Sequence, residues 1–97
     1  MDKKFFALYL LPPRPDFALT MSNEERGIMM KHVEYWTDLM NKGKVVVFGP
    51  VMDPKEIYGL GVVKVDTDSE LKSLIDNDPA NGLNQYEFFP MRAVVPA

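Results

Sequence analysis

The sequence contains no cysteine and only one histidine, His32, and each scarcity excludes a class of chemistry. Without cysteine the chain has no disulfide, no thiolate metal site and no cysteine nucleophile. One histidine without a second one in an HxxxH or HxH pattern does not supply a dedicated zinc site. We therefore predict a protein that uses neither a metal ion nor a cofactor.

Basic runs and long apolar runs are also missing. The 11 basic and 14 acidic residues are scattered and give a net charge of −3, so neither nucleic acid nor an anionic membrane is an expected partner. The first apolar stretch, Lys4 to Leu11, is too short to cross a bilayer, and no small-residue cleavage site follows it. These features predict a soluble, cytoplasmic protein.

What is present is typical of one small globular domain. The 97 residues are 46% hydrophobic and 11% aromatic, and no repeat, linker or low-complexity segment divides them. Chains split into several domains only well above this length. We therefore predict a single domain over residues 1–97.

Capping signals mark the starts of two helices. Ser22 followed by Glu25, and Thr67 followed by Glu70, have the spacing of capping boxes, which satisfy the first N–H groups of a helix. Gly43 suits the C′ position of the first helix. The expected helices span Ser22 to about Lys42 and Thr67 to about Asp78.

Apolar, β-branched and aromatic stretches between turn signals predict four strands. The second is expected to bend or bulge at Gly49-Pro50, and Phe17 to Met21 is expected to be a loop. The expected strands span residues 4–11, 44–52, 57–65 and 85–95.

The resulting order, β-α-β-β-α-β, predicts an α+β fold. Two right-handed crossovers place both helices on one face of an antiparallel sheet, which is a ferredoxin-like sandwich. Proline is confined to edge strands or bulges, and Pro50 and Pro90 lie in the second and fourth strands. The expected strand order is therefore 4-1-3-2.

The first strand is apolar on both of its faces. Phe5, Ala7 and Tyr9 alternate with Phe6 and Leu8, yet two helices cover only one face of the sheet. An uncovered apolar face would exceed what a soluble monomer usually exposes. We therefore expect a homodimer formed through the helix-free face of the sheet.

His32 and Asp78 are the residues that suggest chemistry. His32 lies mid-arc on the apolar face of the first helix, and Asp78 closes the second helix before Pro79. The fold can bring them within about 4 Å of each other, as an imidazole that exchanges protons and a carboxylate that orients it. The simpler interpretation is that His32 is a core residue and Asp78 only ends a helix.

Five further residues are candidates for contact with a substrate. Trp36 and Tyr9 can be core residues or can turn their polar ends toward a pocket beside His32. Gly49 and Pro50 can open space beside the pair, and Arg26 can neutralise an anionic ligand or simply be solvated. The candidate substrate-binding residues are Tyr9, Arg26, Trp36, Gly49 and Pro50.

Several short motifs stand out along the chain: Arg26, His32, Gly43 to Pro50, Asn77-Asp78-Pro79, Gly82-Leu83 and Phe89-Pro90. Together they resemble the YCII-related (YciI-like) family, which belongs to the dimeric α/β-barrel superfamily. The resemblance covers nearly the whole chain. The Pro12 to Met21 segment departs from it, being longer and richer in proline than the family's short connection.

This resemblance implies a dimeric α/β barrel in which the helix histidine and the aspartate of the Asp-Pro step, here His32 and Asp78, form the functional pair. Most members of the family have no assigned activity, and a few resemble lyases or dehydrohalogenases that act on ring compounds. Two hypotheses follow. One is a cofactor-independent lyase or isomerase acting on a small cyclic or carbonyl compound. The other is a homodimer that binds a small molecule without turnover, or has only a structural role, with His32 as a core residue.

Overall fold

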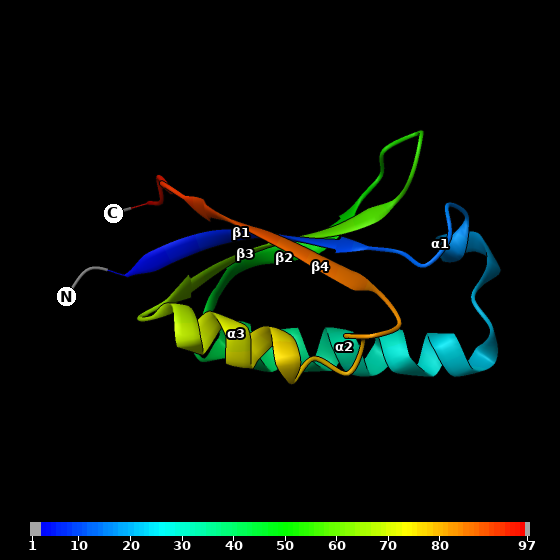
Figure 1. The fold of residues 1–97 in the computed structure, drawn as a ribbon, viewed down its shortest axis with the longest axis horizontal. Helices are drawn as coiled ribbons and strands as arrows, with labels where there is room; N and C mark the ends of the chain where they lie inside the picture. The colour runs from blue at the N-terminus through cyan, green and yellow to red at the C-terminus, as the bar shows by residue number, and fades with distance from the viewer. Residues whose placement is uncertain (1–2, 97) are drawn as a thin grey trace.

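The computed structural model of the chain describes residues 3–96, so Met1, Asp2 and Ala97, at the ends of the predicted domain, lie outside it. Four strands form one antiparallel sheet in the order β2-β3-β1-β4, which is the predicted 4-1-3-2 order. Both long helices pack on the same face of this sheet (Figure 1). The elements are β1 (Lys4–Leu11), α1 (Phe17–Thr20), α2 (Asn23–Asn41), β2 (Val45–Val51), β3 (Tyr58–Val65), α3 (Asp68–Asp76) and β4 (Gln85–Met91).

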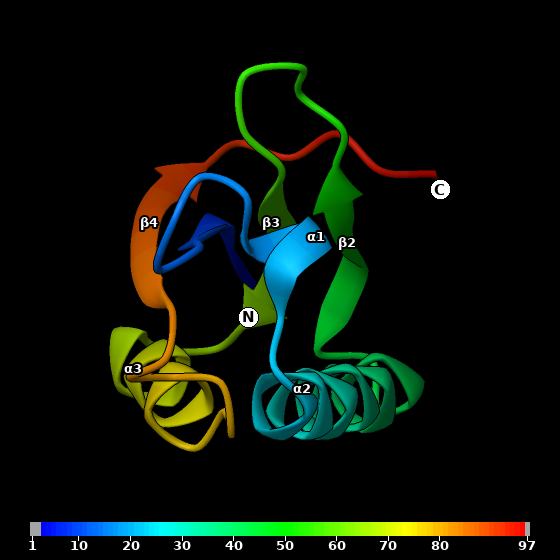
Figure 2. The same cartoon turned by 90° about the vertical axis from the view of Figure 1, so that its right-hand side faces the viewer.

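This arrangement is an α+β fold compatible with the predicted ferredoxin-like sandwich. Figure 2 shows the sheet in one layer and α2 and α3 in the other, with the second face of the sheet free of helices. No helix within residues 3–96 has the length and hydropathy needed to cross a bilayer.

The core lies between the sheet and the two helices. Strand alternation turns one set of side chains from β1 and β3 toward the helices, and Val63 and Val65 are fully buried there. The helices add Trp36 from α2 and Leu71 from α3 to the same cluster. The buried cluster comprises Phe6, Leu8, Trp36, Val45, Val63, Val65, Leu71 and Ile75.

The predicted helix signals act as expected at α2. The Ser22 side chain accepts the Glu25 N–H, and the Glu25 carboxylate accepts the Ser22 N–H, so the capping box is complete. Gly43, just past the end of α2, has a φ of +82°, which glycine adopts without a side-chain clash. At α3, Thr67 caps as predicted, but Glu70 accepts the N–H of Asp66 rather than that of Thr67.

Three local predictions are wrong. The last strand ends at Met91 and not at Val95, because its pairing with β1 ends where Met91 lies opposite Phe5. Phe17–Thr20 is a short helix and not a loop, because the Asp16 carbonyl accepts the N–H groups of Leu19 and Thr20 while Phe17 is buried. The irregularity of β2 lies between Val45 and Val47, and not at Gly49-Pro50, which stays in register with β3. Pro50 is tolerated because β2 is an edge strand, where a missing N–H costs no ladder bond.

Candidate functional site

The carboxylate of Asp78 is the centre of a buried hydrogen-bonded cluster. Its side chain has no exposed surface. The residue follows the end of α3, where Pro79 prevents the helix from continuing. The chain then turns, and the N–H of Ala80 donates to Asp78 Oδ1 at 2.9 Å. The same turn that ends the helix therefore holds the carboxylate in place.

His32 and Trp36 reach this carboxylate from α2. They are four residues apart and so lie on one face of the helix. His32 Nδ1 is 2.8 Å from Asp78 Oδ2 and 3.0 Å from Oδ1, which confirms the predicted contact. Trp36 Nε1 donates to Asp78 Oδ2 at 2.9 Å.

Tyr86, on β4, completes the cluster. Its hydroxyl donates to Asp78 Oδ2 and accepts a second, 3.1 Å contact from Trp36 Nε1. Burial is the main cause that raises the pKa of Tyr86, and the Asp78 carboxylate raises it further. The phenol therefore keeps its proton at neutral pH and remains a donor.

Asp78 is the ionised member of the cluster. Burial would raise the pKa of this carboxyl, but the hydrogen bonds that it accepts, led by the one from His32, lower it below its ordinary value. A carboxylate only accepts hydrogen bonds, so Nδ1 of the facing imidazole must carry a proton. In the neutral ring the second nitrogen, Nε2, then has a free lone pair.

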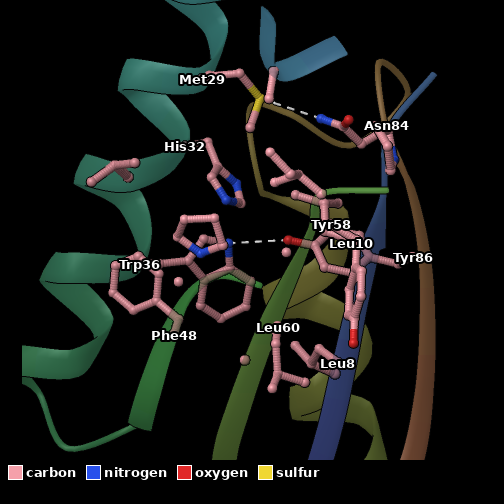
Figure 3. A pocket seen from close by; sticks show the side chains of 18 of the residues that line it. Leu8, Leu10, Met29, His32, Trp36, Phe48, Tyr58, Leu60, Asn84 and Tyr86 are labelled. Atoms are coloured by element: carbon pink, nitrogen blue, oxygen red, sulfur yellow. Dashed lines mark hydrogen bonds between the residues drawn. The ribbon is translucent and has the colours of Figure 1, made fainter. Parts of the chain in front are cut away.

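Nε2 of His32 faces open space. Nε2 has no hydrogen-bond partner among residues 3–96. Every buried side-chain nitrogen and oxygen in that range does have a partner, so Nε2 is not one of the buried atoms. Nε2 is therefore accessible, in agreement with the 12% exposure of the side chain. Figure 3 shows the ring pointing from α2 into a pocket.

This pocket has a volume of about 330 Å³ and lies between α2 and the sheet. Strands β1, β2 and β3 form its floor, and the segment Pro12 to Met21 forms one end. Its walls are almost entirely apolar, with Leu8, Leu10, Phe48 and Met29 among them (Figure 3). Such a cavity is at the small end of the range of about 300–1,000 Å³ that is usual for ligand pockets.

Comparison with known families identifies the chain. The family model of the YCII-related domain matches residues 5–93. The chain belongs to the YCII-related family. No protein with a curated description matches the sequence.

Three of the predicted substrate-binding residues of this YCII-related protein, Trp36, Gly49 and Pro50, line the cavity. Two do not. Tyr9 lies on the helix-free face, where its ring contacts those of Tyr58 and Phe89. Arg26 is exposed and does not line the cavity, because it lies outside the apolar arc of α2.

Sequence reasoning missed Asn84 and Tyr86. Both line the cavity, and Asn84 is only 2% exposed. Tyr86 pairs with Leu10 of β1, so both side chains face the helices. The alternation of β4 contained this signal for Tyr86, but nothing in the sequence alone indicated that Asn84 would be buried. Within residues 3–96 no three His, Asp or Glu side chains gather closely enough to hold a metal ion.

The proline-rich segment at the end of the cavity is tied to α2 by Arg14. Its guanidinium donates to both carboxylate oxygens of Glu25, at 3.0 and 2.8 Å, and to the Thr20 carbonyl at 2.8 Å. It also lies over the ring of Phe17, with its central carbon 5.1 Å from the ring centre. Glu25 therefore completes the cap of α2 and, through Arg14, also anchors the segment at the end of the cavity.

We predict that this ion pair makes stability depend on pH. The hydrogen bond from Arg14 is the largest cause that lowers the pKa of Glu25 from 4.5 to about 2. A lowered pKa means that ionised Glu25 stabilises the fold above pH 4.5 and loses this effect as pH falls toward 2. Glu25→Gln should therefore melt below wild type at pH 7, and the gap should close between pH 4.5 and 2. Thermal melts across this range measure it, with Glu24→Gln, an exposed neighbour, as control; a gap independent of pH would contradict the prediction.

Proposed function

We propose that this YCII-related protein binds a small organic molecule in the cavity and acts on it by cofactor-independent acid–base chemistry of the lyase or isomerase type. His32 takes and returns the proton, and Asp78 orients the imidazole. The observation that carries the proposal is the accessible Nε2 of His32 facing an apolar cavity while buried Asp78 holds Nδ1.

The two ring nitrogens of His32 have different roles in this chemistry. The Asp78 carboxylate selects the tautomer with the proton on Nδ1 and stabilises the imidazolium that forms when Nε2 accepts a proton. Trp36, Tyr86 and the Ala80 N–H hold the carboxylate in place, so it does not reorganise during the transfer. An apolar wall excludes water and strengthens these electrostatic effects.

Binding without turnover is the second candidate function. The almost entirely apolar lining favours it, because such walls supply affinity and leave little beyond His32 for chemistry. The two functions differ in one measurable respect. Only the first requires a proton to move between the ligand and the ring.

Nuclear magnetic resonance can test the proposed base directly, since His32 is the one histidine in the chain. We predict that the neutral imidazole carries its proton on Nδ1, so that two-bond ¹H–¹⁵N spectra show Nε2 as the unprotonated nitrogen. Asp78→Asn removes the charge that selects this tautomer and should shift the population toward a protonated Nε2. A wild-type ring protonated on Nε2 would leave no lone pair toward the cavity and would overturn the proposal.

We also propose that two copies associate through the helix-free face of the sheet. This face presents Val47, Phe89 and Met91, which are 55%, 51% and 42% exposed, and also the ring of Tyr9. Apolar surface of this extent on one face is typical of an interface rather than of a monomer surface. A stable interface needs about 800 Å² from each partner, which a four-stranded sheet can provide.

Phe89→Asp should convert the dimer to a monomer, because it would bury an unpaired charge inside the interface. Light scattering coupled to size exclusion measures the mass. Phe88→Asp is the matched control: Phe88 is equally exposed, at 51%, but pairs with Leu8 and so faces the helix side of the same strand. This control should remain a dimer. Wild type eluting as a monomer, or both variants dissociating alike, would contradict the proposed interface.

A further inference from the structure

Asn84 is a buried polar residue with a weak partner. Its backbone is engaged, because its N–H donates to the Ala80 carbonyl and its own carbonyl accepts the Gly82 N–H. Within residues 3–96 its side-chain Nδ2 donates only to the sulfur of Met29, at 3.3 Å. A thioether is a poor acceptor. The backbone therefore holds the residue firmly, while the amide N–H groups can exchange their partner at little cost.

This amide lies beside the base. Met29, its partner, precedes His32 by three residues on α2, which places the two side chains on one face about 4.5 Å apart along the helix axis. Figure 3 shows Asn84 across from α2, with its amide directed toward Met29 at the end of the pocket where the His32 ring points inward. A ligand in the cavity can therefore contact the amide and Nε2 at once.

The charges around the cavity indicate which ligands fit. Among the described residues that line it there is no Lys, Arg, Asp or Glu. Arg14 is bound to Glu25, and Arg26 is exposed away from the cavity. The charge of a protonated His32 is already compensated by Asp78. A carboxylate or phosphate in this space would lose its hydration without gaining a cation.

We propose that the ligand is an uncharged carbonyl compound, that Asn84 Nδ2 donates to its carbonyl oxygen, and that the adjacent C–H faces Nε2 of His32. This assignment rests on the proposed function and specifies its substrate class. Asn84 is then a catalytic residue that contacts the reacting group. The free protein keeps the donor occupied by the Met29 sulfur until a better acceptor arrives.

The proton-transfer step is balanced by groups already present. Nε2 takes the proton from the carbon next to the carbonyl, and the C–H electron pair becomes a carbon–carbon double bond. The carbonyl π pair moves to oxygen, where the N–H of Asn84 stabilises the enolate. The imidazolium lies between this enolate and the Asp78 carboxylate, and it returns the proton to the same carbon or to a conjugated one. No oxidant, reductant or further reactant is required.

The test uses small cyclic ketones, from cyclobutanone to cyclooctanone, as probes of the whole protein in D₂O. Deuterium entering the carbon beside the carbonyl reports proton transfer without knowledge of the natural substrate, and the ¹⁵N signals of His32 and of the Asn84 amide report contact. Wild type should catalyse exchange in at least one ketone, and that ketone should shift both signals. Asn84→Leu, which keeps the branched shape of the side chain but removes the donor, should lower the exchange rate by about 100- to 1,000-fold. Gln85→Ala, an exposed amide on β4 outside the cavity, is the control and should leave the rate unchanged.

The outcomes separate the two proposals. If no ketone shifts the His32 signal or exchanges in a His32-dependent way, the proposed function fails and this assignment with it. If exchange depends on His32 but Asn84→Leu matches wild type, only the role of Asn84 is overturned. If 3-oxocyclohexanecarboxylate exchanges faster than cyclohexanone, the uncharged substrate class is overturned. Should Asn84→Leu fail to fold, an Asn84 amide signal in wild type that does not respond to a ketone that shifts His32 overturns the role of Asn84.

Discussion

Replacing Asp78 by alanine should lower the free energy of unfolding by about 3–5 kcal/mol, because each buried donor that loses its acceptor costs about 1–3 kcal/mol. The variant leaves the Nε1–H of Trp36 and the hydroxyl of Tyr86 without their shared acceptor inside the core. In a domain of this size the loss corresponds to a fall of at least about 12 °C in Tm. Differential scanning calorimetry at neutral pH measures it.

The effect of Asp78→Ala should also depend on pH. The pKa of Asp78 is lowered in the folded protein, so the carboxylate stabilises the fold above its unfolded pKa of about 3.9 and loses this effect as pH falls below that value. Asp76→Ala is the matched control, since Asp76 is 53% exposed and forms an exposed ion pair with Lys72. That change should cost no more than about 1 kcal/mol. A melt of Asp78→Ala that overlays wild type would contradict the central place of this carboxylate.

Replacing His32 by alanine should reduce proton transfer strongly and stability only moderately. Proton transfer, measured as deuterium exchange into the responding ketone, should fall by about 100- to 10,000-fold, the range that a positioned acid–base group contributes. Stability should fall by only about 1–2 kcal/mol. The reason is that Asp78 keeps the bonds from Trp36, Tyr86 and the Ala80 N–H, while water can enter the cavity in place of the ring.

Lys31→Ala is the control for His32→Ala, because Lys31 is the preceding residue on α2 and is exposed. It should leave both exchange and melting unchanged. If His32→Ala melts as low as Asp78→Ala and there is no exchange to lose, His32 is a structural core residue. If the ketone still binds and never exchanges even in wild type, the protein binds its ligand without turnover.

The four strands, the two long helices and their order could be predicted from the sequence, because their ends depend on neighbours along the chain. The capping box of Ser22 and Glu25 and the turn at Gly43 involve contacts of a few residues, so local chemistry determined where α2 begins and ends. Pro50 and Pro90 placed their strands at the edges for the same reason, since the missing N–H belongs to the residue itself. The position of His32 on the apolar arc of α2 indicated that it would face the sheet.

Only the tertiary structure decided which face of the sheet a side chain occupies and which partners each buried polar group contacts. The sequence does not indicate which face of the sheet Tyr9 occupies. The register of β1 with β3 and β4 places its side chain on the helix-free face, on the other side of the sheet from His32. The side chain of Asn84 is placed beside the cavity by its contact with Met29 of α2, which is 55 residues away in the chain. The cavity itself exists because α2, three strands and the Pro12 to Met21 segment fail to fill the space between them. The volume of the cavity depends on how all of these elements pack together, so it cannot be predicted from any single stretch of the sequence.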